Sequence, residues 1–421
     1  MCIPLNPRLI DSGVLKDFLG RSRELPLSIY VRDRPYKSID KRTVLQLVDL
    51  LSKCSSRLFN LRVEMRGHFL PLFKDIVPPN TSASIKGLHL WCPGGSDIPN
   101  VNIDLKGISP SRLTLCRVPI LRLTINWSSI AELDITRIHL TDCLELLGET
   151  FLLIRCKFSA IFQPPSNVRW SGQSIVLPSL KDIDLGFLTN ESDELDVEDI
   201  DAFLKTLTLP ALESFCLDMD GERFPSDCFL SLLHRSSCSL QDLKITGAVL
   251  ATDGFVRVLK SIPSLKTLDI EPRSSFSPKI FFSALATPSA TTAAAQRTNG
   301  AHMFLPSLIT LRYHSDSPKS LPWNLIPAVF GPIGVLRQGQ TWRPLRRLHF
   351  ILFSSQGASA LNANIDLNVF PTFLALKTAG VDLQILNDAT GQDILEPLAV
   401  SLPVLKLVES CLNMAIFTLV Q

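Results

Sequence analysis

The sequence predicts an α/β protein in which single strands alternate with helices in a repeating series. Leucine is unusually frequent, at 70 of 421 residues. A short phrase recurs with apolar residues at its first, fourth and sixth positions, and alternation of this kind is typical of a strand with one buried face. Segments with helical periodicity, each preceded by a short polar residue, lie between copies of the phrase. Together these three observations favour repeated strand–helix units.

The expected strands follow one another along most of the chain. The clearest copy of the phrase is Leu180-x-x-Ile183-x-Leu185. Four copies follow a Leu-Pro or Ile-Pro dipeptide, whose proline is expected to end the preceding helix. The copies begin at Leu58, Ile85, Val118, Ile130, Phe151, Leu180, Leu212, Leu240, Leu265, Leu308 and Leu345.

The spacing of the copies indicates the type of repeat. Their central residues recur every 25 to 32 residues between Ile183 and Leu268, close to the period of leucine-rich repeats. A doubly wound sheet would show longer apolar strands and a phosphate-binding glycine cluster, and the sequence contains neither. We therefore expect an α/β leucine-rich-repeat solenoid, a horseshoe with a parallel concave strand face and convex helices, whose stacked units share one core.

Four helices are expected to begin directly after a residue that can cap a helix N-terminus. Each capping residue precedes an apolar stripe that would pack against the strands. These residues are Asp142, Asp199, Ser226 and Asp253.

The chain is expected to divide into four parts. Residues 1–55 would form an N-terminal cap with a helix near 38–54, and residues 56–352 would form the solenoid. Residues 353–390 would form the C-terminal cap, with a helix and a strand within 370–386, and residues 391–421 a loosely docked tail. Two insertions are expected in the solenoid, a low-complexity loop at 286–303 and an irregular Pro- and Gly-rich segment at 315–340.

Composition and charge argue against several classes of protein. Lysine and arginine total 42 and aspartate and glutamate total 40, so the formal net charge of +2 gives no basic field for nucleic acid or anionic membrane. The longest uncharged apolar stretch, residues 320–336, contains three prolines, which a spanning helix would not tolerate. The start of the chain lacks the features of a secretory signal. We expect a cytoplasmic or nuclear protein that binds neither nucleic acid nor membrane.

The sequence contains no recognisable motif for catalysis. It has no nucleophile elbow, no His-Glu-x-x-His and no phosphate-binding loop. Its ten cysteines include no Cys-x-x-Cys pair and fit buried free thiols. The acidic run at 191–199 is better explained as a solvated loop entering a helix than as a calcium site. We therefore expect no catalytic residue, no metal site and no cofactor, and we do not expect an enzyme.

Side chains that alternate away from the core would line the concave strand face. Glu132, Asp134, Arg155 and Lys157 come first on this face, its middle is mostly acidic, and its C-terminal end carries arginine and histidine. The acidic part predicts a protein partner with a basic segment, although solvent-facing strand positions are also polar without any ligand. The candidate binding residues are Asp182, Asp184, Asp218, Asp242, Lys244, Asp269, Glu271, Arg312, His314, Arg347 and His349.

Several longer phrases resemble a known family. They are Leu15–Leu27, Leu140–Leu147, Phe151–Phe158, Leu209–Ser214, Phe229–Leu240 and Ala379–Leu383. In these phrases the chain resembles the F-box/leucine-rich-repeat proteins abundant in mushroom-forming (basidiomycete) fungi, over roughly residues 10–390. Members of that family usually begin with an F-box, which opens on a Leu-Pro-x-Glu-like phrase and docks the adaptor of a cullin-type ubiquitin ligase. No such phrase is visible in this chain.

The resemblance implies a function in protein recognition. The chain would be the substrate-recognition region of an F-box-type receptor for a cullin ubiquitin ligase, with the ligase adaptor as a partner if an F-box is encoded upstream. The alternative is a free-standing leucine-rich-repeat scaffold with no ligase association. An in-frame Leu-Pro-x-Glu phrase upstream of Met1 would favour the first hypothesis.

Overall fold

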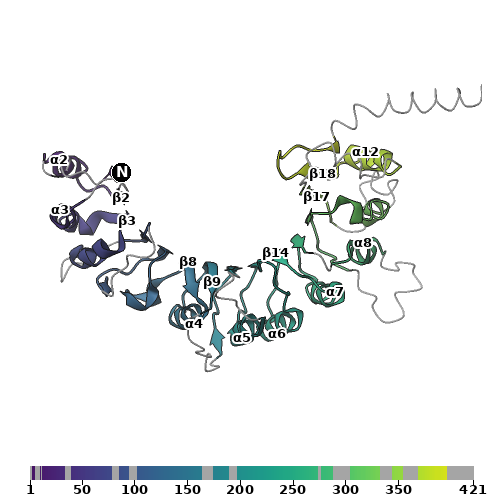
Figure 1. The fold of residues 1–421 in the computed structure, drawn as a ribbon, viewed down its shortest axis with the longest axis horizontal. Helices are drawn as coiled ribbons and strands as arrows, with labels where there is room; N and C mark the ends of the chain where they lie inside the picture. Colours follow the sequence, from purple (N-terminus) through teal and green to yellow (C-terminus); the bar gives the residue numbers. More distant parts are fainter. Residues whose placement is uncertain are drawn as a thin grey trace, which may run out of the picture. The chain divides into compact units, whose positions relative to one another are not determined.

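The computed structural model describes residues 2–4, 10, 12–33, 39–77, 85–93, 102–163, 174–188, 197–273, 276–287, 304–331, 344–353 and 368–395. The chain forms two compact units. The first comprises residues 1–220 and 228–238, and the second comprises residues 221–227 and 239–421. In both units parallel strands follow one another in chain order (Figure 1), which confirms the predicted α/β class with a large parallel sheet.

The sheet of the first unit is built from strands that each pair with the preceding one. Its described strands are β1 (Cys2–Pro4), β2 (Leu27–Arg32), β3 (Leu58–Glu64), β4 (Gly87–Trp91), β6 (Arg112–Cys116), β8 (Glu132–His139), β9 (Arg155–Phe162), β11 (Asp182–Phe187) and β13 (Ser214–Asp218). Two separate short pairs join β5 (Ile103–Asp104) to β7 (Leu123–Thr124) and β10 (Ile175–Val176) to β12 (Leu207–Thr208).

Helices and 3₁₀ turns connect the strands of the first unit. The α-helices are α2 (Val14–Arg21), α3 (Lys41–Ser52), α4 (Leu140–Glu149), α5 (Val197–Thr206) and α6 (Ser226–Ser236). The 3₁₀ segments are η1 (Ser55–Arg57), η2 (Gly67–Asp75), η3 (Ile120–Arg122) and η4 (Trp127–Ser129). Helix α3 begins at an N-cap, where the Asp40 side chain accepts a hydrogen bond from the backbone N–H of Thr43.

The second unit repeats the same pattern. Its strands are β14 (Asp242–Ala248), β15 (Thr267–Pro272), β16 (Thr310–Ser315), β17 (Arg347–Leu352) and β18 (Asp382–Asn387). Its helices are α7 (Thr252–Lys260), α8 (Pro278–Ala286), α9 (Ile326–Val329) and α12 (Phe370–Thr378), with η6 (Pro318–Ser320) before α9. Helices α7, α8 and α12 lie on one side of these strands (Figure 1).

Rows of aligned apolar side chains form the core of each unit. Leu113, Leu133 and Cys156 are register partners in the first unit, and all three are buried. Leu268, Leu311 and Leu348 are aligned in the same way in the second unit, and all three have no solvent exposure. Because each strand contributes to the same rows, neighbouring repeats bury one another's apolar faces, as stacked repeats require.

The expected capping residues of these four helices lie inside the helices rather than before them. Helix α4 begins at Leu140 and α7 at Thr252, so Asp142 and Asp253 lie in the first turn rather than before it. Asp199 lies in the first turn of α5 for the same reason, and α6 begins at Ser226 itself. An acidic side chain in the first turn still interacts favourably with the helix dipole. The sequence therefore predicted where these helices begin to within a few residues, but it did not identify their N-cap residues.

Two expected strand phrases are displaced. Phe151 and Ile154 of the predicted phrase are exposed and precede strand β9, which begins at Arg155 and buries Cys156 and Phe158. The phrase that begins at Val118 does not lie in the main sheet, because Leu123 belongs to the short strand β7. The main-sheet strand there is β6, which the sequence analysis missed.

The segments expected to form the N-terminal and C-terminal caps, residues 1–55 and 353–390, contain the helices and the strand that the sequence predicted there. Helix α3 lies within residues 38–54, and α12 and β18 lie in or beside residues 370–386. The expectation of a loosely docked segment from residue 391 is wrong for its first residues, because Ile394 and Leu395 are buried and Asp393 accepts a hydrogen bond from Ile385 of β18. Residues 396–421 lie outside the described residues.

The two expected insertions are only partly described. Residues 288–303 and 332–343 lie outside the described residues. Within the segment expected to be irregular, Trp323, Ile326 and Val329 are buried around helix α9, so this part contributes to the core. Within the described ranges, no helix is long and apolar enough to cross a membrane.

Candidate binding face of the parallel sheet

One face of the sheet carries polar side chains that alternate with the buried apolar rows. Parallel sheets are usually covered on both faces and then contain continuous apolar strands. Here β11 alternates half-exposed and buried residues along its whole length, and β4 and β8 show similar alternation. The side chains of one face are therefore partly exposed on these strands of the first unit.

Opposite charges form a ladder across β8, β9 and β11 in the first unit. The Arg155 guanidinium lies 3.0 Å from the Asp182 carboxylate and 3.9 Å from that of Glu132. In the next row, the Lys157 ammonium lies 3.0 Å from the Asp184 carboxylate. The parallel register aligns Asp182 with Arg155 and Asp184 with Lys157, so the ladder follows directly from strand pairing.

Two side chains at this ladder, Lys157 and Asp134, have shifted pKa values. The hydrogen bond from Lys157 to Asp184 raises the pKa of the lysine. Burial raises the pKa of Asp134, and the nearby Asp184 carboxylate raises it further, whereas Lys157 lowers it. Its surroundings therefore disfavour the ionised form of Asp134 relative to a solvated carboxyl group.

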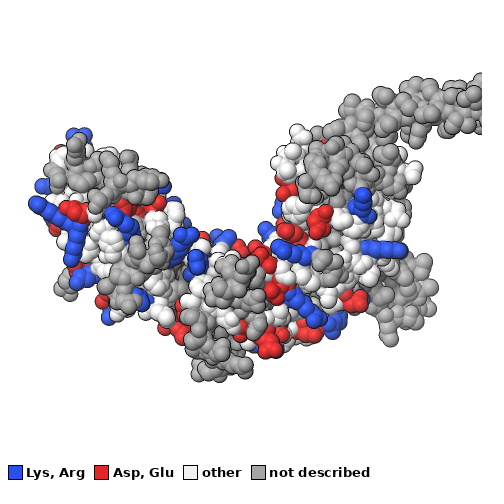
Figure 2. All heavy atoms as spheres, viewed as in Figure 1, with Lys and Arg blue, Asp and Glu red and all other residues white. Residues whose placement is uncertain are grey.

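An open groove of about 520 Å³ lies over this ladder. It is lined by residues of β6, β8, β9, β11 and β13, among them Asp134, Lys157 and Asp184. Lys and Arg side chains are interspersed with Asp and Glu on the visible surface (Figure 2). The expected mostly acidic surface is thus not found at Asp182 and Asp184, because Arg155 and Lys157 pair with both carboxylates.

Asp218 is exposed at the end of β13. In the second unit Asp242 and Lys244 are exposed on β14, in register with Thr267 and Asp269. Glu271 is half-buried on β15. None of these four predicted residues therefore belongs to the buried rows of apolar side chains.

Asp269 is the most deeply buried of the predicted binding residues, with 9% exposure. Its carboxylate lies 3.0 Å from His314 Nε2 and 3.9 Å from the Arg312 guanidinium, both on the neighbouring strand β16. These partners compensate the buried charge. Asp269 is therefore part of a polar cluster and is poorly placed as an exposed anchor for a basic segment.

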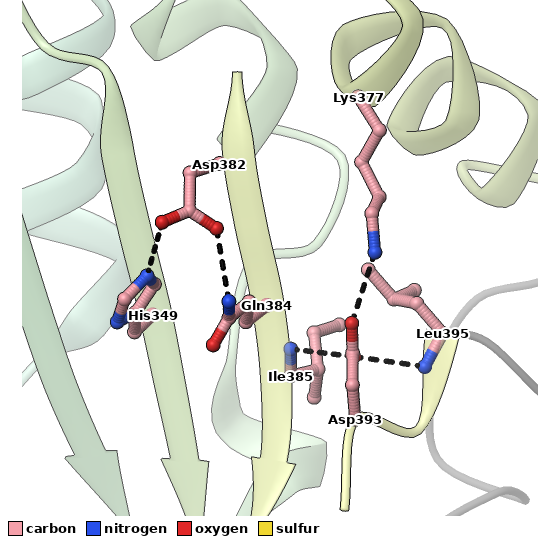
Figure 3. A network of polar contacts seen from close by, with 7 residues as sticks. All are labelled: His349, Lys377, Asp382, Gln384, Ile385, Asp393 and Leu395. Atoms are coloured by element: carbon pink, nitrogen blue, oxygen red, sulfur yellow. Dashed lines mark hydrogen bonds and ion pairs between the residues drawn. The ribbon is translucent and has the colours of Figure 1, made fainter. Parts of the chain in front are cut away.

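His349 and Asp382 form a similar pair on β17 and β18. His349 Nε2 lies 3.1 Å from one carboxylate oxygen of Asp382, and the other oxygen accepts a hydrogen bond from Gln384 (Figure 3). Arg347 is exposed on β17 and is aligned with Asp382. The expected basic end of the face therefore also contains a carboxylate.

A second groove was missed by the sequence analysis. It also measures about 520 Å³ and lies over β2, β3, β4 and β6. Its polar lining comprises Ser28, Tyr30, Asn60, Arg62, His89, Arg112 and Thr114. The alternation in the phrases at Leu58 and Ile85 could have identified Arg62 and His89, but Arg112 lies on β6, which no predicted phrase covered.

The described residues include no group of three side chains suited to a metal ion. The cysteines at positions 54, 92, 116, 143, 156, 216, 228 and 238 are free thiols. Burial raises the pKa of the Cys143 and Cys156 thiols well above the ordinary value, which makes both poor nucleophiles at neutral pH. No protein-family model matches the chain, and no curated protein is significantly similar to it.

Proposed function

We propose that this protein is a protein-interaction module of the leucine-rich-repeat type, and that it is the substrate-recognition region of an F-box-type receptor for a cullin ubiquitin ligase. The exposed face of the sheet in the first unit would hold the partner. The proposed activity is binding without chemical conversion of the partner.

The observation that carries this proposal is the polar face of a parallel sheet. A parallel sheet with one open face is unusual outside repeat proteins, which use that face to bind extended partners. In the first unit this face carries two grooves lined by side chains from several strands. Such grooves suit an extended segment that crosses successive strands. The ligase connection rests on the resemblance of the chain to F-box/leucine-rich-repeat proteins.

The alternative is a free-standing scaffold, and co-purification separates the two. The full-length product of the transcript would be tagged and isolated from its own cells with cullin modification blocked. The receptor hypothesis predicts that a cullin and its adaptor are recovered with the tagged protein. Recovery of other partners at comparable yield without cullin or adaptor would favour the scaffold and contradict the ligase assignment.

A further inference from the structure

A third groove lies at the end of helix α4, on the side of the first unit where its helices lie (Figure 1). It measures about 420 Å³ and is lined by α4, by the turn that follows it and by strand β10. Phe151 in this turn and Val176 on β10 both line the groove, and both are more than half exposed. Leu152, next to Phe151, is half exposed as well. Large apolar side chains that are exposed together indicate a surface that another chain covers.

The charged side chains at this groove are acidic. Among the described residues that line it, the ionisable ones are Glu145 and Glu149. They lie four residues apart and are therefore neighbours on the helix surface. Glu149 ends α4, where the helix dipole is negative, and the last turn contains no basic residue. A basic side chain supplied by another chain would offset this concentration of negative charge.

Gly148 leaves the groove open beside these carboxylates. It lines the groove, and a Cβ at this position would meet no atom within 4 Å. Because glycine has no side chain, the backbone of another helix can approach α4 closely at this point. The groove is therefore suited to a helix that carries both apolar and basic side chains.

Helix α2 is such a helix. Val14 and Phe18 are more than half exposed, and Arg21 follows three residues later. This spacing places the three side chains on one side of the helix. Leu15 and Leu19 are buried, so they hold α2 to its own unit by another side. Terminal repeats of a solenoid usually have a polar outer surface, so the exposure of Val14 and Phe18 is not explained by stacking.

The charges around the exposed side of α2 are complementary to those of the α4 groove. Five exposed residues between positions 14 and 25 are charged, and three of them are basic. The five are Lys16, Asp17, Arg21, Arg23 and Glu24. Leu25, which follows them, is also exposed and apolar. An apolar surface with basic side chains in one place thus matches an apolar groove with carboxylates in another.

The two surfaces cannot meet within one chain. Helix α2 precedes β2 and α4 follows β8, and β3, β4 and β6 lie between these strands in the sheet. Both helices are fixed to the first unit by buried side chains and lie apart in it (Figure 1). Only a second copy of the chain can therefore bring an α2 to this groove.

We propose that α2 of a second copy docks in the α4 groove. Val14 and Phe18 cover Phe151 and Val176, and Arg21 lies opposite Glu149. Because the two surfaces differ, the contact is heterologous and leaves each pair with one free α2 and one free groove. Further copies add at both, so that the chain assembles head to tail. This inference does not depend on the proposed function.

The test is the oligomeric state of the purified full chain and of two variants. In sedimentation velocity runs between about 1 and 100 µM, we expect the average mass of the wild type to rise with concentration. Phe18→Asp in the helix and Phe151→Asp at the groove should each give a monomer. An equimolar mixture of these two variants should form a one-to-one pair, since one retains an intact groove and the other an intact α2. Leu121→Asp is the matched control, because Leu121 is 74% exposed in the same unit and belongs to neither surface; it should associate like the wild type.

Charge reversal tests the pairing of Arg21 with Glu149. Arg21→Glu and Glu149→Arg should each weaken self-association at least tenfold, because each places like charges opposite one another. The variant that carries both changes should regain most of the affinity, since every copy then presents the reversed pair. Association that stays weak in this double variant would contradict the assigned pairing.

Three results would overturn the inference as a whole. They are a wild type that stays monomeric at every concentration, self-association that persists in both Phe18→Asp and Phe151→Asp, and a mixture of the two variants that does not pair. If the chain is monomeric but is recovered with a cullin and its adaptor, the inference fails and the proposed function stands. If the chain assembles through these surfaces without a cullin or an adaptor, the inference stands and the ligase assignment fails.

Discussion

Asp134 illustrates how a single side chain on the sheet face is placed for reasons other than stability. Its carboxylate is half-buried beside Asp184, while the nearest ammonium, that of Lys157, is engaged by Asp184. The raised pKa of Asp134 means that ionisation costs folding free energy. A residue in this position is a candidate for ligand contact, because folding alone would favour a neutral side chain.

We predict that Asp134→Asn stabilises the protein at neutral pH. A carboxyl group whose folded-state pKa is raised stabilises the fold at low pH and loses that contribution as pH rises through the folded-state pKa. Asparagine does not ionise, so the variant keeps its stability as the pH rises through this range. The thermal midpoint of the variant should therefore exceed that of the wild type at pH 7, and the difference should shrink towards pH 4. A variant that is less stable at pH 7 would show that the Asp134 charge is compensated.

Asp393 fastens the end of the described chain to the last strand. One carboxylate oxygen accepts hydrogen bonds from the backbone N–H groups of Ile385 and Leu395, each at 3.1 Å. The other lies 2.9 Å from the Lys377 ammonium on α12 (Figure 3). Asp393 thus joins the helix, the strand and the segment that follows them.

We predict that Asp393→Ala loosens strand β18. Loss of these charge-assisted hydrogen bonds should cost about 2–3 kcal/mol, mostly as local opening. Amide hydrogen exchange should accelerate in residues 382–387 and not in the first unit. Asp388→Ala is the control, because Asp388 is exposed in the adjoining turn. Equal acceleration in both variants would contradict the role assigned to Asp393.

Helix α8 shows how an element is fixed by packing. Phe281 and Phe282 are both fully buried, and their rings lie 6.4 Å and 5.5 Å from that of Tyr313 on β16. Phe282 also contacts Phe350 on β17, at 5.7 Å between ring centres. Ile280 on the same helix is 48% exposed. Phe281 and Phe282, on the side of the helix that faces the strands, therefore hold α8 in position.

We predict that Phe282→Ala destabilises the second unit by about 3–5 kcal/mol, the usual cost of removing a buried aromatic ring. Ile280→Ala should change stability by less than about 1 kcal/mol, because the side chain is largely solvated. Denaturant unfolding followed by circular dichroism would measure both. Similar losses in the two variants would mean that the buried side of α8 is misassigned.

The sequence predicted elements better than it predicted sites. The phrases at Leu180, Leu265 and Leu308 correspond to β11, β15 and β16, since alternation in a strand is a local property of the chain. Strand β6 was missed because its apolar residues Leu113 and Leu115 stand close to the competing phrase at Val118. The groove over β2, β3, β4 and β6 depends on the register between β3, β4 and β6, and no local pattern encodes such a register.

Charge pairing across strands could not be predicted from the sequence either. Asp182 and Asp184 were expected to form an acidic surface, but the parallel register places each beside a basic residue of β9. Arg155 and Asp182 are neighbours only through strand pairing. The sequence alone therefore could not show that their charges pair. In the first unit, the groove over the ladder is therefore lined by paired opposite charges, and the groove over β2, β3, β4 and β6 is lined by Arg62 and Arg112.

At the scale of the whole molecule, the central claim is that partner proteins other than a second copy of the chain bind the open strand side of the units and not the helical side. A photo-crosslinking amino acid would be introduced at Ser214 and Thr267 on the strand side, and at Ser231 and Ile280 on the helical side. After irradiation in cells, the strand-side positions should give discrete crosslinked species and the helical positions none. Crosslinks confined to Ser231 and Ile280 would contradict the account.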